Sequence, residues 1–213
     1  MVTYRIAALV AGFALLVAGC TSDTDGSPES TDDGDGPGAT GDPDPGGVEL
    51  PHSGAPSVDN PIDPEPFLGE PCSVFDVDAL EVAGFEILEV TPEPKAPVGP
   101  TCQWIFDPRS DGSFSGIFGQ LDEQGVSSVY AQRDSLDLFE ELDPIEGHPI
   151  VAYSQHDGRE SGRCSVAVGL RDDFAYDIGV TAIGVDNEYS ADPCGTAHEL
   201  AGLAIETMTE GEE

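Results

Sequence analysis

The sequence predicts an α+β domain in which helices pack on one face of an antiparallel β-sheet and two disulfides hold the parts together. Three observations support this prediction. Two neighbouring segments alternate apolar residues with small or polar ones, which is typical of strands that bury one face. The last segment carries an apolar stripe at helical spacing. Four cysteines remain after a leader-like start, and an even number in a secreted chain implies two disulfides.

Residues 1–19 are predicted to be a lipoprotein signal peptide. An arginine near the start is followed by a run of almost wholly apolar residues and by small residues before Cys20. This order is typical of a secretory leader, and the run is too short to span a bilayer. Residues 17–20 resemble a bacterial lipobox, which predicts that Cys20 carries acyl chains such as palmitate and binds membrane lipid. The alternative is an ordinary leader that contains a cysteine by chance.

Residues 20–66 are predicted to be the lipidated cysteine and a disordered tether. From Thr21 to Pro66 the chain holds eight Gly, nine Pro and twelve Asp or Glu, with no Lys or Arg. A segment of low hydrophobicity and high net charge buries too little surface to offset the entropy lost on ordering. Residues 67–213 are then expected to form a single α+β extracellular domain.

The domain is expected to open with a short helix. Ser73 with Asp76 resembles a capping box, and Gly84 is suited to end the helix. Further along, alternation and turn residues predict the next elements. These are strands at 85–90, 101–107, 114–121 and 149–155, and a helix at 126–133.

The strands at 164–170 and 174–180 are the clearest in the sequence. Both alternate strictly, and the three residues between them are suited to a hairpin. After this hairpin, Asp192 is placed to cap a helix that has Pro193 at its first position. The helix carries one apolar stripe: Cys194, Ala197, Ala201, Ala204, Ile205 and Met208.

Four cysteines of the domain are predicted to form disulfides: Cys72, Cys102, Cys164 and Cys194. Three connectivities are possible. Pairing Cys72 with Cys102 and Cys164 with Cys194 is favoured, because each bond would then fasten the start of a helix to a strand. Metal ligation is disfavoured, because the sequence has no C-x-x-C pair and the compartment is oxidising.

The charge of the chain argues against a nucleic-acid partner. Seven Lys or Arg stand against 42 Asp or Glu, a formal net charge of −35. A surface this acidic repels phosphate backbones unless it has a local basic patch, and the basic residues are scattered along the sequence. No cofactor is expected.

Motifs for hydrolysis are weak. A serine hydrolase needs serine at the centre of its G-x-S-x-G turn, and residues 112–116 have Phe114 there. Adjacent acids such as Glu140-Glu141 and Asp172-Asp173 could suggest glycoside hydrolysis. In a domain with thirty acids such pairs arise by chance, so they select no site.

The histidines and the tryptophan are expected to be structural or exposed. His148 and His156 lie eight residues apart, about 26 Å along one strand, so they cannot share a metal, and we expect both on the surface. His198 lies off the apolar stripe of its helix and is also expected to be exposed. Trp104 lies two residues from Cys102 on an alternating strand, which favours packing beside the disulfide over ligand stacking.

The order of several short motifs resembles a known family. These are Pro71-Cys72-Ser73, Cys102-Gln103-Trp104, Gly147-His148-Pro149, Cys164-Ser165-Val166 and Asp192-Pro193-Cys194. With the lipobox, this order is similar to the actinobacterial envelope lipoproteins grouped as domain of unknown function 3558. The resemblance implies a lipid-anchored extracellular domain with two disulfides, and it carries over no catalytic residue.

The sequence therefore predicts a lipid-anchored protein on the outer face of the plasma membrane, in the cell envelope. Its domain is expected to be non-catalytic and to bind a small-molecule ligand or another envelope protein. The alternative is a secreted hydrolase with a carboxylate-based active site. A deep pocket lined by two or more acids at catalytic spacing would favour the hydrolase, and a shallow apolar groove or an exposed sheet face would favour binding.

Overall fold

The computed structural model describes residues 49–107, 112–119, 123–182 and 188–210. All of them belong to one compact unit, residues 44–213. The expected signal peptide and Cys20 lie outside the described residues.

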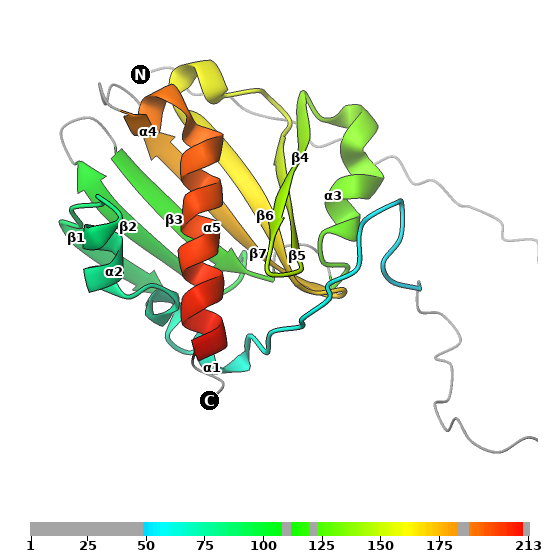
Figure 1. Ribbon diagram of the computed structural model, residues 1–213, viewed down its shortest axis with the longest axis horizontal. Coiled ribbons are helices and arrows are strands. Elements are labelled where there is room, and N and C mark those ends of the chain that lie inside the picture. Colours follow the sequence, from blue (N-terminus) through cyan, green and yellow to red (C-terminus); the bar gives the residue numbers. More distant parts are fainter. Residues whose placement is uncertain (1–48, 108–111, 120–122, 183–187, 211–213) are drawn as a thin grey trace, which may run out of the picture. The chain divides into compact units, whose positions relative to one another are not determined.

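A single antiparallel sheet of seven strands forms the centre of the domain, in the order β1-β2-β3-β7-β6-β5-β4 (Figure 1). Successive side chains of a strand point to opposite faces, and one face packs against the main core. The α+β prediction is confirmed. The strands are β1 (Glu89–Glu93), β2 (Thr101–Asp107), β3 (Gly112–Phe118), β4 (Leu138–Ile145), β5 (His148–Ser154), β6 (Arg163–Arg171) and β7 (Phe174–Ala182).

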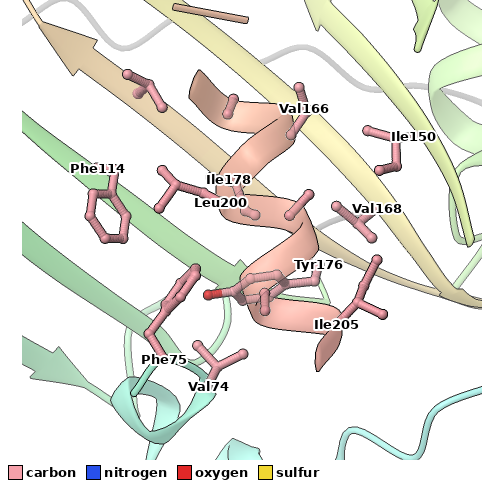
Figure 2. Packing of buried hydrophobic residues seen from close by; sticks show 14 of the residues in the cluster. Val74, Phe75, Phe114, Ile150, Val166, Val168, Tyr176, Ile178, Leu200 and Ile205 are labelled. Atoms are coloured by element: carbon pink, nitrogen blue, oxygen red, sulfur yellow. The ribbon is translucent and has the colours of Figure 1, made fainter. Parts of the chain in front are cut away.

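The long helix α5 (Pro193–Glu210) lies across one face of this sheet (Figure 1). Its apolar stripe packs on the inward residues of the central strands, and Figure 2 shows Leu200 and Ile205 among side chains from β3, β5, β6 and β7. Burial of each large apolar side chain contributes roughly 1.5–3 kcal/mol. The predicted terminal helix and its stripe are confirmed.

A short helical stretch packs into the same core beside β1, β2 and β3. It consists of α1 (Glu65–Leu68), the 3₁₀ turn η1 (Pro71–Val74) and α2 (Val77–Val82). Phe75, between the last two, meets the rings of Trp104 at 4.9 Å and Phe114 at 5.4 Å, both edge-on. Trp104 is fully buried, which agrees with the expectation that it packs in the protein rather than stacking on a ligand.

The cap of the first predicted helix differs from the expected capping box. Asp76 is the N-cap of α2, and its carboxylate accepts from the amide of Asp78 at 2.8 Å. Ser73 lies in the preceding turn η1, where its hydroxyl donates to the carbonyl of Glu70. The turn therefore separates the two residues that the sequence pattern placed in one helix.

A smaller apolar cluster lies on the opposite face. The helix α3 (Ser127–Gln132) packs there against Val151, Ala167 and Ala175, which have the opposite strand parity to the residues under α5. The rings of Tyr130 and Phe139 meet edge-on at 5.1 Å. Helix α5 thus covers one face of the sheet, and the short α3 covers part of the other. The remaining short elements are η2 (Arg133–Ser135), η3 (Arg159–Ser161) and α4 (Glu188–Ala191).

Two disulfides join helical elements to the sheet. Cys72 of η1 is bonded to Cys102 of β2, and Cys164 of β6 is bonded to Cys194 in the first turn of α5. The favoured connectivity is confirmed. Each bond closes a loop with a sequence separation of 30, which restricts the unfolded chain and contributes about 3–4 kcal/mol on the chain-entropy account.

The packed part of the chain begins before Phe67, so the expected end of the tether at residue 66 is too late. Val58 and Ile62 are buried. The amide of Ile62 donates to the carbonyl of Leu170 at 2.9 Å, and the amide of Val58 donates to the Asp172 carboxylate at 2.8 Å. Val58 and Ile62 are isolated apolar residues among prolines, so they give no periodic pattern in the sequence. In the structure both pack against the β6–β7 hairpin.

Two strands also differ from the sequence prediction. The first strand occupies Glu89–Glu93 rather than residues 85–90, and Phe85 is instead a buried core residue. Strand β4 has no counterpart among the predicted elements, because acids and a proline interrupt its alternation. Among the described residues, no helix combines the length and apolarity that crossing a membrane requires.

Candidate functional site

On the face opposite α5, strands β3, β7 and β6 present polar and small side chains beyond the area that α3 covers. The register of these strands arranges the side chains in rows across the sheet. The first row is Ser113, Thr181 and Arg163, and the second is Ser115, Gly179 and Ser165. We call these six residues the trough.

A cavity of about 460 Å³ lies over the trough, and all residues of the second row line it. On one side it is bounded by the chain that follows Ser154, because the β5–β6 ladder pairs only residues 150–152 with 166–168. The open groove thus lies on the sheet face, beside the point where β5 stops pairing with β6.

Gly179 forms the floor of the trough between two hydroxyl groups. A Cβ on Gly179 would lie 3.3 Å from the Ser115 Oγ and 3.7 Å from the Ser165 Oγ. Both hydroxyls therefore flank an open strip of backbone. A ligand placed there would meet hydroxyl groups from β3 and β6 and the bare main chain of β7.

The wall formed by residues 154–162 is tied to the sheet. The amide of Arg163 donates to the carbonyl of Gly158 at 3.0 Å, and the amide of Ala182 donates to the carbonyl of Gly162 at 2.8 Å. Gly162 has φ +73°, a left-handed conformation that favours glycine, and it ends η3. Hydrogen bonds to β6 and β7 therefore fix the backbone of this wall.

One arginine of the wall bonds two acids. Arg159 donates to Asp157 at 2.7 Å and to Glu140 at 2.9 Å. The hydrogen bonds from Arg159 hold the pKa of Asp157 below its ordinary value. Arg163, in contrast, has no hydrogen-bond or ion-pair partner for its side chain anywhere in the part of the chain that the structure describes.

A buried carboxyl group lies in the next row beyond the trough. Asp177 pairs in register with Ile117 and Ala167, and it is 4 % exposed. Tyr153 of β5 donates to its Oδ1 at 2.6 Å, while Oδ2 is buried without a partner in the described structure. Burial raises the pKa of Asp177 to about 7. Burial and the neighbouring Asp177 charge also raise the pKa of Tyr153 strongly.

The histidines considered from the sequence do not form a site. His148 is expected on the surface, and that prediction is wrong: it is fully buried, with Nδ1 2.7 Å from the carbonyl oxygen of Gly169. It opens β5, and its ring lies against the main chain of β6, away from solvent. His156 lies in the groove wall with a 95 % exposed side chain. His198 is half-buried, and its ring lies 2.7 Å from the carbonyl oxygen of Asp143.

The adjacent acids serve other contacts. Glu140 pairs with Arg159, and Asp173 pairs with Arg171. Asp172 accepts a hydrogen bond from a main-chain amide of the N-terminal segment. Within the described ranges, no three His, Cys, Asp or Glu side chains are grouped so that they could hold a metal ion.

The trough itself is not apparent from the sequence. In the sequence, Ser113 and Ser115 stand out only as parts of an incomplete hydrolase motif, and Ser165 and Gly179 only as the small partners of an alternating pattern. The available signal is that these outward positions are small and polar rather than long and charged. These residues form a site only because the strand order β3-β7-β6 places them side by side on one face of the sheet.

Comparison with known proteins gives one match. A family model described as protein of unknown function (DUF3558) matches residues 15–207. No curated protein and no solved structure matches the chain.

Proposed function

The chain belongs to the DUF3558 family of proteins of unknown function, and from that premise we propose a lipid-anchored cell-envelope protein whose extracellular domain binds a ligand in the trough. The anchoring part of this proposal rests on the signal-like residues 1–19 and on Cys20. The binding part rests on the geometry of the sheet face.

The observation that supports binding is the pair of serine hydroxyls on either side of Gly179. Neither hydroxyl is used in a hydrogen bond within the described structure, and both border a groove of about 460 Å³. Small-molecule sites are concave and use a few well-placed polar groups to orient the ligand. Serine side chains on paired strands are also placed more firmly than side chains on loops.

Carboxylate-based hydrolysis is less well supported by the same groove. It requires two carboxyl groups on either side of the bond that is cleaved. Among its described lining residues the groove has one carboxylate, Asp157, and that group is bound to Arg159. Asp177, on the same sheet face, is buried and bound to Tyr153 rather than presented to the groove.

The test is to fill the trough and look for lost binding. The mature protein and a Gly179→Leu variant are each incubated with a polar extract of the cell envelope, washed, and analysed by mass spectrometry for retained compounds. We expect the wild type to retain at least one compound that Gly179→Leu does not, because the new side chain would occupy the floor between Ser115 and Ser165.

Gly69→Leu is the matched control, because a Cβ there meets nothing within 4 Å and the residue does not line the groove. This variant should retain the same compound as the wild type. Equal retention by Gly179→Leu, or no retention by any of the three proteins, would contradict binding in the trough.

A further inference from the structure

The electrostatic setting of the trough differs from that of the rest of the domain. Residues 67–213 contain thirty Asp or Glu and six Lys or Arg. In such an excess of acid, a basic side chain is expected to find a carboxylate partner. An arginine without such a partner is therefore available to bind a negatively charged group of a ligand.

The other described arginines are already engaged. Arg159 and Arg171 bond carboxylates, and Arg133 donates to a main-chain carbonyl at 3.2 Å. Arg163 has no such partner in the described structure, and it lines the groove. The described lysine, Lys95, is exposed in the turn after β1, outside the groove.

The backbone of Arg163 is held in place, while its side chain is exposed at the groove. Arg163 opens β6 and pairs in register with Thr181 of β7. On its other side the wall packs so closely that a Cβ on Gly158 would lie 3.0 Å from the Arg163 Cβ. The guanidinium is thus attached to a backbone position that is held in place. This position lies at one end of the row that contains Thr181 and Ser113.

The groups around this guanidinium suit an oxyanion. Arginine presents a planar fork of donors that matches a carboxylate, and hydroxyl groups supply further donors. Ser165 is two residues from Arg163 on the same face of β6, and Ser115 lies across Gly179 from Ser165. One unpaired guanidinium balances one negative charge, so in this acidic domain a singly charged carboxylate fits better than a doubly charged phosphate.

We propose that the trough binds a small molecule bearing one carboxylate, with the carboxylate on the Arg163 guanidinium and the adjoining polar groups on Ser165 and Ser115. This inference rests on the proposed binding function and names the class of ligand. The cation orients the ligand, and the hydroxyls on either side of Gly179 bond its uncharged part.

The test uses the mature protein and a matched pair of probes. N-acetylglycine carries a carboxylate, and N-acetylglycinamide is its neutral counterpart. Amide NMR shifts of Ser165, Gly179 and Thr181 are followed as each probe is added. We expect saturable shifts with N-acetylglycine and none with N-acetylglycinamide, and a weaker response to inorganic phosphate than to N-acetylglycine.

Arg163→Gln should weaken N-acetylglycine binding by about tenfold or more, because a charged hydrogen bond is lost. Arg171→Gln is the control, since that arginine lies on the same strand but pairs with Asp173, and it should leave the affinity unchanged. Ser165→Ala keeps the charge, and we expect it to weaken binding several-fold. Unchanged affinity in Arg163→Gln, or equal binding of the neutral probe, would overturn the carboxylate assignment.

The extract experiment separates this inference from the proposed function. If Gly179→Leu abolishes retention of a compound that is neutral or cationic, the trough binds a ligand and only the carboxylate assignment fails. If Gly179→Leu retains everything that the wild type retains, binding in the trough fails as a whole.

Discussion

The carboxyl group of Asp177 has an unusual environment for an acidic residue. It lies on the central strand β7, accepts one hydrogen bond from Tyr153, and has a second oxygen buried without a partner in the described structure. A carboxylate in such a place is desolvated, so its neutral form is favoured and its pKa rises to about 7.

We predict that Asp177 makes the domain less stable as the pH rises from about 4 to about 7. The folded state keeps this proton up to about pH 7, whereas the unfolded state releases it near the ordinary value of 3.8. The unfolding free energy should therefore fall across that window, by up to about 4 kcal/mol from this group, and level off above it. Asp177→Asn should remove this contribution. Urea unfolding at a series of pH values measures the difference between the two proteins.

Asp173→Asn provides the comparison for this measurement, because Asp173 is exposed and pairs with Arg171. It should leave the pH dependence close to that of the wild type. If the wild type and Asp177→Asn differ by a constant amount from about pH 4 to about pH 8, the carboxyl of Asp177 does not titrate in that window.

At the scale of elements, a local hydrogen bond sets the start of α5. The amide of Gly195 donates to the Asp192 carboxylate at 2.9 Å, and Pro193 occupies the first helical position. Gly195 leaves room for this cap, because a Cβ there would overlap the Asp192 side chain. The same turn carries Cys194, so the cap and the disulfide together fix this end of the helix.

We predict that Asp192→Ala lowers the unfolding free energy by about 1 kcal/mol, which is the usual cost of losing an N-cap. The measurement is denaturant unfolding of the intact, oxidised protein. Glu199→Ala, an exposed position in the body of the same helix, should change stability far less. Equal effects of the two substitutions would mean that the cap does not stabilise α5.

Elements with a strong repeating pattern could be predicted from the sequence, and those without one could not. The hairpin β6–β7 and the stripe of α5 follow from alternation and helical spacing. Strand β4 could not be predicted, because Glu140, Glu141 and Pro144 interrupt the alternation of an edge strand that pairs with β5 alone. The buried place of His148 and the trough depend on which strands lie side by side, and no local pattern in the sequence encodes that order.

At the scale of the whole molecule, residues 21–48 separate the predicted lipid site from the described part of the domain. We predict that Cys20→Ala moves the protein from the membrane fraction to the soluble fraction, because the acyl chains need the thiol of this cysteine. Immunoblotting of fractionated cells measures the distribution. Ser22→Ala, which keeps the lipobox, should remain with the membrane. Membrane association of Cys20→Ala would contradict lipid anchoring.

The order of the sheet leaves β1 and β4 as its two edges. Strand β1 is short, with a glutamate at each end and Pro92 within it. Strand β4 carries three acids and Pro144. Charges and prolines on an edge strand disfavour the addition of another strand, and a second copy of this acidic chain would also bring like charges. Copies of this protein that are crowded together are therefore protected against joining their sheets edge to edge. The growth of fibrils by strand addition is disfavoured at both edges of the sheet.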